Sequence, residues 1–485
     1  MDAEATVRPH DFAPDRAGAL QALLAREALL VLSVASFVIA LVLRLPGQVN
    51  QDAWLALLAG REIVRGGLPS QDTLTAWTLG EAWIDQQWLA HLAFYGLFAA
   101  GGLALVCMAH AILTGGAYAT AVIAARRRGA SGRSVLLVLP VCFWLLIFGS
   151  WQARTQTFAY LPFVGLVWLL AADSRAPSRR VFLVLPLLAV WANLHGSVVL
   201  AAGLVVLRGL LEVRRAPVRA AVLVVAPVAS LFVSPYGLSV GSYYASTLFN
   251  PAFGAMLNEW MPTTLSPGTA PFFALGLLAV WLAGRCRERF TTFEALTLLA
   301  TFASGLLAGR SVVWFALAAI VLLPFALDGV LPVARPGAGS VRLNVALAAG
   351  SVATLGVLLG VTLARPAAWF ERPYSPAAAD AVATAAARHP SAGVYADAKY
   401  ADWLLWREPG LRGRVAYDIR FELLATERIV EIYNFNNPGG AWRRPARGHR
   451  ILVLDESLSA RPIRELRADG ARVAYRGRGA VVLLR

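Results

Sequence analysis

Lysine and cysteine are rare in this sequence of 485 residues. Lysine occurs once, as Lys399, so arginine carries nearly all of the basic charge. The three cysteines, Cys107, Cys142 and Cys286, lie in or beside apolar segments without metal-ligand spacing, so neither a disulfide framework nor a zinc site is predicted. Nucleotide-binding fingerprints are missing too, because no stretch matches GxGxxG or GxxxxGK followed by serine or threonine.

Acidic residues are also few. Aspartate and glutamate number 29 against 44 basic residues, and the formal net charge is +15. This charge would suggest a nucleic-acid partner for a soluble protein, but 58% of the residues are apolar and the mean hydropathy is +0.59. The arginines cluster at the ends of apolar segments, where they set topology and meet anionic headgroups. The sequence therefore predicts a polytopic α-helical membrane protein whose partner is the lipid bilayer, and no nucleic acid.

Long apolar runs fill most of the chain up to residue 364. A membrane-spanning helix needs about 20 apolar residues, and about eleven runs approach that length, which predicts about 11 crossings with a range of roughly 10 to 13. The first run ends without a small-residue cleavage site, which favours a retained helix over a signal peptide. The runs are 27–45, 103–124, 134–149, 157–173, 180–193, 196–213, 219–234, 271–284, 292–308, 311–328 and 343–364.

Basic connectors between the runs predict the orientation, because such connectors stay in the cytoplasm. For a protein of the bacterial plasma membrane, one topology keeps all of these basic connectors in the cytoplasm. It gives a cytoplasmic N-terminal tail (1–26) and places the other inter-helix tips and the C-terminal region outside. It also requires residues 88–102 to form an interfacial or re-entrant helix rather than a separate crossing. The connectors are 125–128, 174–180, 212–219, 284–289 and 334–342.

The composition changes after the transmembrane domain, which we predict to cover residues 27–364. Prolines and an alanine-rich stretch predict a linker helix within 365–390. Short apolar runs then alternate with helical stretches, which predicts a small extracytoplasmic α/β domain over 391–485. The expected strands are 393–396, 414–417, 450–455, 471–475 and 480–485.

The first outer loop, residues 46–91, concentrates acids in a chain that has few. A carboxylate at the mouth of a dry cavity can act as a general base toward an acceptor hydroxyl, and Asp52 is the candidate for this role. Asp52 also fits the N-cap of a helix starting at Ala53, and the two roles are compatible. Asp72 and Asp85 are predicted to support Asp52 in the site, or else to serve as turn or cap acids.

Three basic residues at the outer tips are candidates for binding a donor phosphate. Arg154 could clamp a phosphate in a bidentate manner or reach lipid headgroups. His195, in WANLHGS, is either structural or a hydrogen-bond donor to phosphate or sugar. Arg310 stands alone between two apolar helices and is the third candidate.

Other polar and aromatic residues at the same tips are expected to bind substrate. They are Gln156, Asn193, Glu259 and Trp260. In the C-terminal region, Asp418, Arg420 and Glu422 alternate and would share one face of an extended segment, which predicts an ion-pair ladder on the surface.

Several motifs together resemble a known enzyme class. A membrane helix followed by QDAWLALLAGREIVRGGLPSQD and then WIDQQWL resembles the GT-C superfamily of membrane glycosyltransferases, which take a sugar from a polyprenyl-phosphate carrier. In that class an acid of the first outer loop, matched here by Asp52, serves as base or active-site carboxylate. The loop, RTQTF, WANLHG, YADWLLW and RVAYDIRFE are similar more closely to uncharacterised bacterial glycosyltransferases. The chain lacks a clear DxD pair in this loop and the HPP-type motif of protein mannosyltransferases, departures that bear on metal use and protein O-mannosylation.

The resemblance implies a transferase that moves a sugar from a polyprenyl-phosphate-linked donor to a glycan, lipid or protein acceptor by an inverting displacement. No cofactor is assigned, no residue is predicted to be a metal ligand, and use of a divalent metal such as Mg²⁺ or Mn²⁺ is left open. Two alternatives also stay open: a transporter or flippase of lipid-linked glycans, and a non-catalytic partner in cell-envelope assembly.

Overall fold

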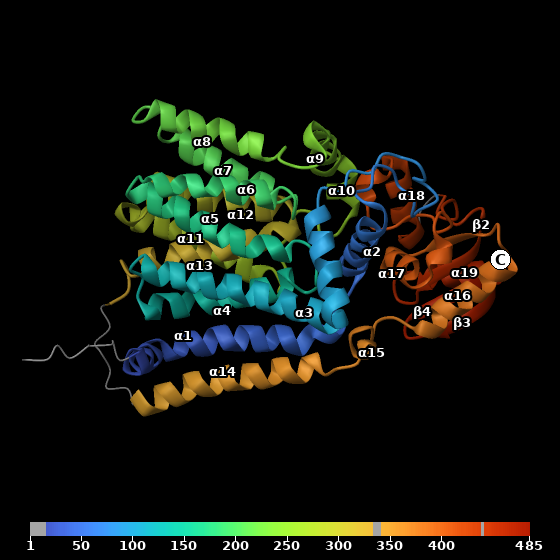
Figure 1. Cartoon of the computed structure of the whole chain (residues 1–485), viewed down its shortest axis with the longest axis horizontal. Helices are drawn as coiled ribbons and strands as arrows, with labels where there is room; N and C mark the ends of the chain where they lie inside the picture. The colour runs from blue at the N-terminus through green and yellow to red at the C-terminus, as the bar shows by residue number, and fades with distance from the viewer. Residues whose placement is uncertain (1–15, 333–340, 438–440) are drawn as a thin grey trace, which may run out of the picture.

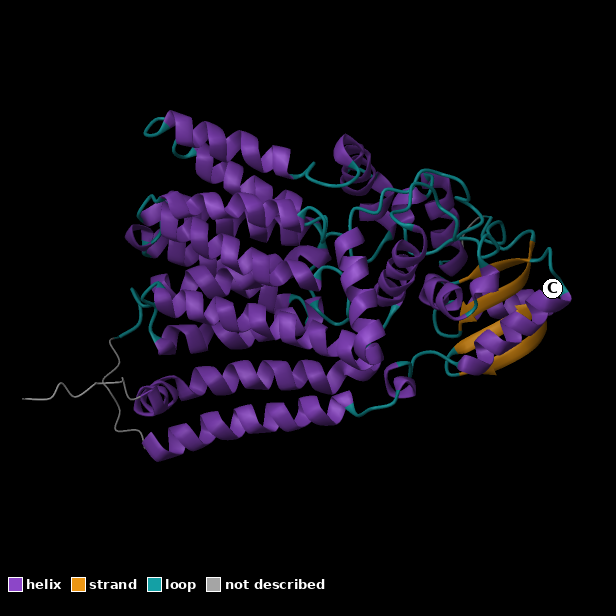
Figure 2. Ribbon diagram, viewed as in Figure 1, coloured by secondary structure: helices purple, strands orange, loops and turns teal. Residues whose placement is uncertain are grey.

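A bundle of apolar helices forms most of the structure, and a four-stranded sheet lies beyond one end of it (Figure 1, Figure 2). This computed structural model describes residues 16–332, 341–437 and 441–485. Most of the predicted N-terminal tail and most of the connector 334–342 therefore lie outside the described residues.

Six helices in the described ranges are long and apolar enough to cross a membrane, which makes this a multi-pass membrane protein. They are α1 (Arg16–Arg44), α3 (Trp88–Arg127), α4 (Gly132–Gly149), α5 (Thr157–Arg175), α13 (Val312–Leu327) and α14 (Val341–Leu363). Four shorter apolar helices are α7 (Val198–Leu210), α8 (Pro217–Ser230), α11 (Ala270–Arg285) and α12 (Thr292–Leu307). The remaining predicted run, 180–193, is divided between η2 (Arg179–Leu183) and α6 (Val184–Trp191). Each predicted run thus contains helix, while the number of crossings stays a prediction.

The apolar surface of each helix decides its place in the bundle. Helix α13 is apolar on every side, and 78% of its most apolar stretch is buried, as expected for a central helix. The corresponding stretch of α14 is only 17% buried, and α14 lies beside α1 at the edge of the bundle (Figure 1).

Ion pairs gather the basic connectors at the end of the bundle away from the sheet. Arg128 and Arg175 both reach the buried carboxylate of Glu294, at 2.6 and 2.7 Å. Arg208 forms another buried ion pair, at 2.9 Å from the carboxylate of Asp173. The connectors 125–128, 174–180 and 212–219, which we expect on one side of the membrane, therefore lie together at one end of the bundle.

Two glycines break α3 into two helical segments. Gly102 has φ 63° and ψ −162°, a backbone conformation that essentially only glycine adopts, and Gly101 before it is also non-helical. The segment before the break runs across the direction of the bundle helices, as an interfacial helix would (Figure 1). It packs closely on α2 (Gln51–Gly66), because a Cβ atom at Gly60 would lie 2.3 Å from the carbonyl oxygen of His91.

The C-terminal region follows α15 (Ala367–Phe370) and α16 (Pro376–Arg388). Its sheet has the order β1-β2-β4-β3, in which β1 and β2 are parallel and the other pairs antiparallel. The strands are β1 (Gly393–Ala396), β2 (His449–Asp455), β3 (Arg472–Gly477) and β4 (Ala480–Leu484), and the helices are α17 (Ala398–Arg407), α18 (Thr426–Asn436) and α19 (Ala460–Ala468). The predicted strand 414–417 is wrong, because Val415 makes only single bridges, one to Val394 and one to Thr75 of the first outer loop.

Short helices and turns complete the connections. They are α9 (Val240–Leu248), α10 (Pro251–Met256), η1 (Leu45–Gly47), η3 (Gly237–Ser239), η4 (Arg287–Arg289), η5 (Gly309–Ser311), η6 (Pro409–Leu411) and η7 (Phe421–Leu423).

Candidate active site

Two carboxylates share one arginine at the end of the bundle nearest the sheet. Arg154 Nη1 donates to Glu259 Oε2 at 2.6 Å and lies 3.8 Å from Asp52 Oδ2. Gln152 Nε2 donates to Asp52 Oδ2 at 2.6 Å and to Glu259 Oε1 at 3.3 Å. The loop between α4 and α5 therefore joins two acids that are far apart in the chain. Both carboxylates are 35% exposed, whereas the arginine side chain is 5% exposed.

The start of α2 fixes Asp52. The helix begins at Gln51 with Asn50 as its N-cap, so Asp52 is in the first turn and is not the cap. A carboxylate there is favoured by the helix dipole. Burial nevertheless raises the pKa of Asp52 above its ordinary value, against the lowering effect of Arg154. A carboxylate with a raised pKa is a stronger base toward a hydroxyl.

Glu259 is shifted in the opposite direction. Burial works to raise the pKa of Glu259, but the charges of Arg154 and Arg310 outweigh it and hold this pKa below its ordinary value. Two neighbouring carboxylates with diverging pKa values can take different roles. Glu259, at 2.6 Å, is the closer counter-ion of Arg154, and the role of Asp52 as a general base stays a prediction.

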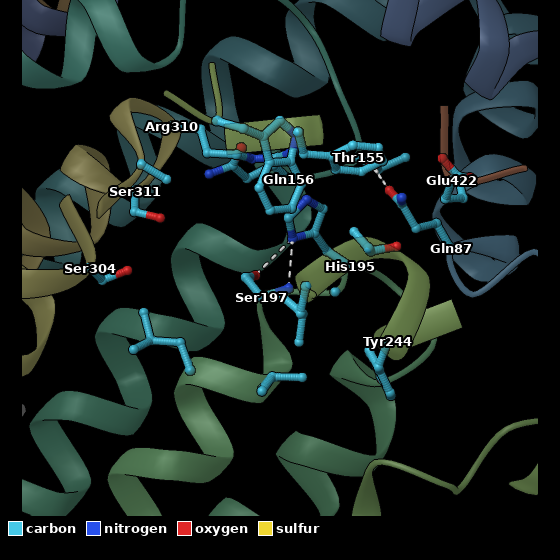
Figure 3. Close-up of a pocket in the computed structure, with 18 of the residues that line it drawn as sticks. Gln87, Thr155, Gln156, His195, Ser197, Tyr244, Ser304, Arg310, Ser311 and Glu422 are labelled. Atoms are coloured by element: carbon cyan, nitrogen blue, oxygen red, sulfur yellow. Dashed lines mark hydrogen bonds between the residues drawn. The ribbon is translucent and has the colours of Figure 1, made fainter. Parts of the chain in front are cut away.

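The hydrogen bonds of His195 define its tautomer. The backbone N–H of Ser197 donates to His195 Nδ1 at 3.1 Å, so Nδ1 is an acceptor and the proton of the neutral ring is on Nε2. Burial, followed by Arg310 and Arg154, holds the pKa of His195 well below its ordinary value, which keeps the ring neutral. Nε2–H has no hydrogen-bond partner within the described ranges and is a donor available to a ligand (Figure 3).

Arg310 in η5 is a cation without a carboxylate partner in the part of the chain that the structure describes. Its guanidinium carbon lies 4.6 Å from the centroid of the Trp260 ring. Its backbone N–H donates to the carbonyl of Glu259 at 2.9 Å, so η5 is fastened to the segment that carries the second acid. The unpaired guanidinium is suited to a phosphate ligand.

A cavity of about 680 Å³ lies beside this group, although Glu259 and Gln152 are not part of its lining. Its polar end contains Asp52, Arg154, Gln156, His195 and Arg310. Away from that end the lining is mostly apolar, supplied by α7, α9 and α12, and two of these helices belong to the bundle. The cavity therefore continues from a charged site at the loops into the apolar part of the molecule. Figure 3 shows His195 and Ser197 in the middle of this cavity. The members from the three helices are Val199, Leu200, Gly203, Leu204, Leu207, Tyr243, Tyr244, Thr247, Leu248, Ala300 and Ser304.

Comparison with known proteins matches this architecture to solved membrane glycosyltransferases. The chain is similar to the archaeal oligosaccharyltransferase AglB from Archaeoglobus fulgidus, solved in complex with an inhibitory peptide and a dolichol-phosphate, with a TM-score of 0.50 and 12% identity over 88% of this chain and 69% of that chain. The fold is of the GT-C type. The fold that the sequence motifs resemble is thereby confirmed.

A second solved structure aligns over nearly the whole of both chains. ArnT from Cupriavidus metallidurans bound to undecaprenyl phosphate aligns with a TM-score of 0.49 and 16% identity, over 96% of this chain and 98% of that chain. No protein-family model and no curated protein matches the chain.

The two acids predicted to support Asp52 lie outside the cavity lining. Asp72 is fully buried and accepts hydrogen bonds from Thr75 at 2.6 Å and from Arg420 at 2.8 Å. Asp85 lies 2.9 Å from His91 Nδ1. Both acids hold the first outer loop in shape, which agrees with the alternative of turn acids.

Gln156 and Asn193 have different surroundings. Gln156 lines the cavity, and its Oε1 is buried without a partner in the described ranges. Asn193 is not in the lining, because Nδ2 donates to the carbonyls of Ala189 and Val233 and Oδ1 accepts from Trp88 at 2.7 Å. Asn193 therefore fixes the start of α3, and Gln156 stays a candidate for substrate binding.

Several site residues were not predicted from the sequence. Gln152, which contacts both acids, is two residues before Arg154 in the same hairpin, but a neutral side chain gives no charge signal. The predicted surface ladder is wrong: Arg420 is buried between Asp418 and Asp72, and it lines the cavity together with Glu422. The C-terminal region covers the first outer loop, and this contact removes the ladder from solvent.

The two acids of the candidate site both contact an arginine. Asp52 and Glu259 both lie within 4 Å of Arg154, whose charge disfavours a cation between them. Among residues 16–332, 341–437 and 441–485, no group of three or more His, Cys, Asp or Glu is placed to hold a metal ion.

Proposed function

We propose that this protein transfers a glycosyl group from a polyprenyl-phosphate-linked donor to an acceptor at the outer face of a bacterial plasma membrane. The cavity carries the proposal, because it joins a cationic end to a mostly apolar part that bundle helices help to line. A lipid phosphate needs both, cations for its headgroup and apolar surface for its chain. The GT-C fold supports the proposal, since AglB has been solved with a dolichol-phosphate.

The orientation is part of this proposal. The arginine-rich end of the bundle faces the cytoplasm, and the N-terminus is inside. The site and the C-terminal region then face outward.

Each polar residue has a role in the proposed reaction. Arg154, Arg310 and the Nε2–H of His195 bind the donor phosphate and neutralise the charge that develops as it leaves. The acceptor oxygen forms a bond to the anomeric carbon while the bond from that carbon to the phosphate oxygen breaks, and the electron pair leaves with the polyprenyl phosphate. Asp52 takes the acceptor proton, and inversion follows from this single displacement. Glu259 is a positioning residue that holds Arg154.

Binding of a polyprenyl phosphate to the detergent-extracted protein tests the proposal. Arg310→Ala should weaken binding by about tenfold or more, since a charge-assisted contact is lost. Arg65→Ala is the matched control, because Arg65 is exposed and outside the cavity lining. Equal binding by the two variants would remove the phosphate site from Arg310.

Formation of a glycosylated product separates a transferase from a flippase. Membranes containing the protein are supplied with a radiolabelled lipid-phosphosugar, and the label is followed into the acceptor. Repeating the assay after chelation, with and without Mg²⁺ or Mn²⁺, measures metal dependence directly.

A further inference from the structure

The C-terminal region supplies one wall of the cavity. Residues 419–422 line it, and η7, which contains Glu422, packs against α9. Nothing in the reaction assigned above uses this wall, although it brings two charged side chains to the site.

Arg420 is held rigidly in this wall. Its Nη2 donates to Asp72 at 2.8 Å and to Asp418 at 2.6 Å, and its guanidinium carbon lies 4.3 Å from the centroid of the Trp83 ring. Two carboxylates balance its charge, so it does not add a free cation for a phosphate. Its Nη1 is buried and has no hydrogen-bond partner in the described part of the chain. A fixed donor next to the cavity is therefore left unused.

Glu422 differs from the two acids beside Arg154. Its half-buried side chain has no hydrogen bond or ion pair to another residue within residues 16–332, 341–437 and 441–485, whereas Asp52 and Glu259 both contact Arg154. A free carboxylate repels phosphate and accepts hydrogen bonds from hydroxyl groups.

Uncharged groups with spare hydrogen-bonding capacity complete this side of the cavity. Thr155 Oγ1 donates to Gln87 Oε1, and Gln87 Nε2 donates to Tyr243 Oη at 3.4 Å. The amide oxygen of Gln87 retains a lone pair, and its NH₂ group retains a proton. Figure 3 shows Gln87 and Glu422 on one side of the view and Arg310 on the other. The cavity thus has a phosphate-binding side and a side that suits neutral polyols.

We propose that Glu422, Gln87 and Arg420 form a subsite for the hydroxyl groups of a sugar ring. Glu422 accepts from ring hydroxyls, Arg420 Nη1 donates to one, and Gln87 does both. The subsite rests on the proposed function for its location beside a lipid phosphate. The sugar is either that of the lipid-linked donor or that of a glycan acceptor, which present the same hydroxyl chemistry.

Binding measurements with three probes test the subsite. They are a polyprenyl phosphate, the same lipid with a neutral hexose on its phosphate, and a methyl hexoside added to protein saturated with the polyprenyl phosphate. Glu422→Gln keeps the side-chain volume and removes the charge. The matched control is Glu427→Gln, because Glu427 is exposed in the same region. Thermal unfolding of both variants checks that the fold is retained.

The expected result is that Glu422→Gln weakens binding of one sugar-bearing probe by about 10- to 100-fold and leaves the bare lipid phosphate unchanged. Weaker binding of the hexosyl lipid shows that the subsite holds the donor sugar. Weaker binding of the hexoside shows that it holds the acceptor sugar. An equal loss on the bare lipid, or no change on any probe, overturns the subsite. If the wild-type protein binds no polyprenyl phosphate, the proposed function fails, and the hexoside titration without lipid then decides the subsite separately.

Discussion

Arg420 donates a hydrogen bond to Asp72 at 2.8 Å, across 348 positions of the chain. This contact fastens the C-terminal region to the first outer loop. Burial works to raise the pKa of Asp72, but Arg420, Thr75 and Thr78 hold it below its ordinary value. Because the folded-state pKa is lowered, the ionised acid stabilises the fold above its ordinary pKa, and this stabilisation is lost as the pH falls through the folded-state value.

We therefore predict that Asp72→Asn lowers the free energy of unfolding by about 1–3 kcal/mol, because Arg420 loses one of its two buried carboxylate partners and keeps Asp418. Chemical denaturation in detergent measures it. Glu456→Gln, which breaks the exposed pair with Arg476, should cost about 1 kcal/mol or less. Similar losses in both variants would contradict the prediction.

Asp52→Asn should reduce glycosyl transfer by about 10²- to 10⁴-fold, because an amide cannot take the acceptor proton. Binding of polyprenyl phosphate should change little, since the amide can still accept the hydrogen bond of Gln152. The transfer assay measures the first effect, and Glu81→Gln, an exposed acid of the same loop, is its control. Full activity in Asp52→Asn would remove Asp52 from the role of base.

The sugar subsite should depend on pH through Glu422. Burial raises the pKa of Glu422 to about 7, with Arg420 opposing this rise and Asp418 and Asp85 adding to it. Tyr243 faces the carboxylate from α9. The carboxylate form accepts hydrogen bonds, so binding of the sugar-bearing probe should strengthen as the pH rises through about 7.

A titration of the hexosyl lipid and the hexoside from about pH 5 to 9 measures this dependence. The profile should become flat in Glu422→Gln. A rise that survives in this variant would assign the titration to another group.

The glycine at the break in α3 should affect the stability of the protein. Gly102→Ala should destabilise the protein by about 1–3 kcal/mol, because its backbone conformation is strained for any residue with a Cβ atom. Gly96→Ala, earlier in the same helix where a Cβ atom meets nothing within 4 Å, should be neutral or slightly stabilising. Thermal unfolding of the pair measures the difference. Equal stability would show that the break does not depend on glycine.

The parts of this protein that the sequence predicts are those that one segment determines by itself. An apolar run becomes a helix wherever it lies, so all the predicted runs contain helix. Polar residues at the ends of such runs are costly to bury, and Asp52, Arg154, His195 and Arg310 do line one cavity.

Contacts between distant segments could not be predicted in this way. Asp72 and Asp52 are both acids of the first outer loop. Only the contact with Arg420, from a distant part of the chain, makes Asp72 a structural acid. The sequence around Val415 is typical of a strand, yet Val415 forms only isolated bridges to residues that are distant in the chain. Glu422 was predicted to be solvated because nothing nearby in the chain shows that α9 covers it.

The bridge at Val415 has a consequence for how the protein is made. Ala76 and Trp77 donate their backbone N–H groups to the carbonyls of Val415 and Ala416, at 2.7 and 3.0 Å. The ribosome adds Val415 and Ala416 only after all the bundle helices. During most of translation, the N–H groups of Ala76 and Trp77 therefore lack these two carbonyl acceptors. A chain that terminates after α14 would expose that loop to proteases, and only full-length chains would become resistant.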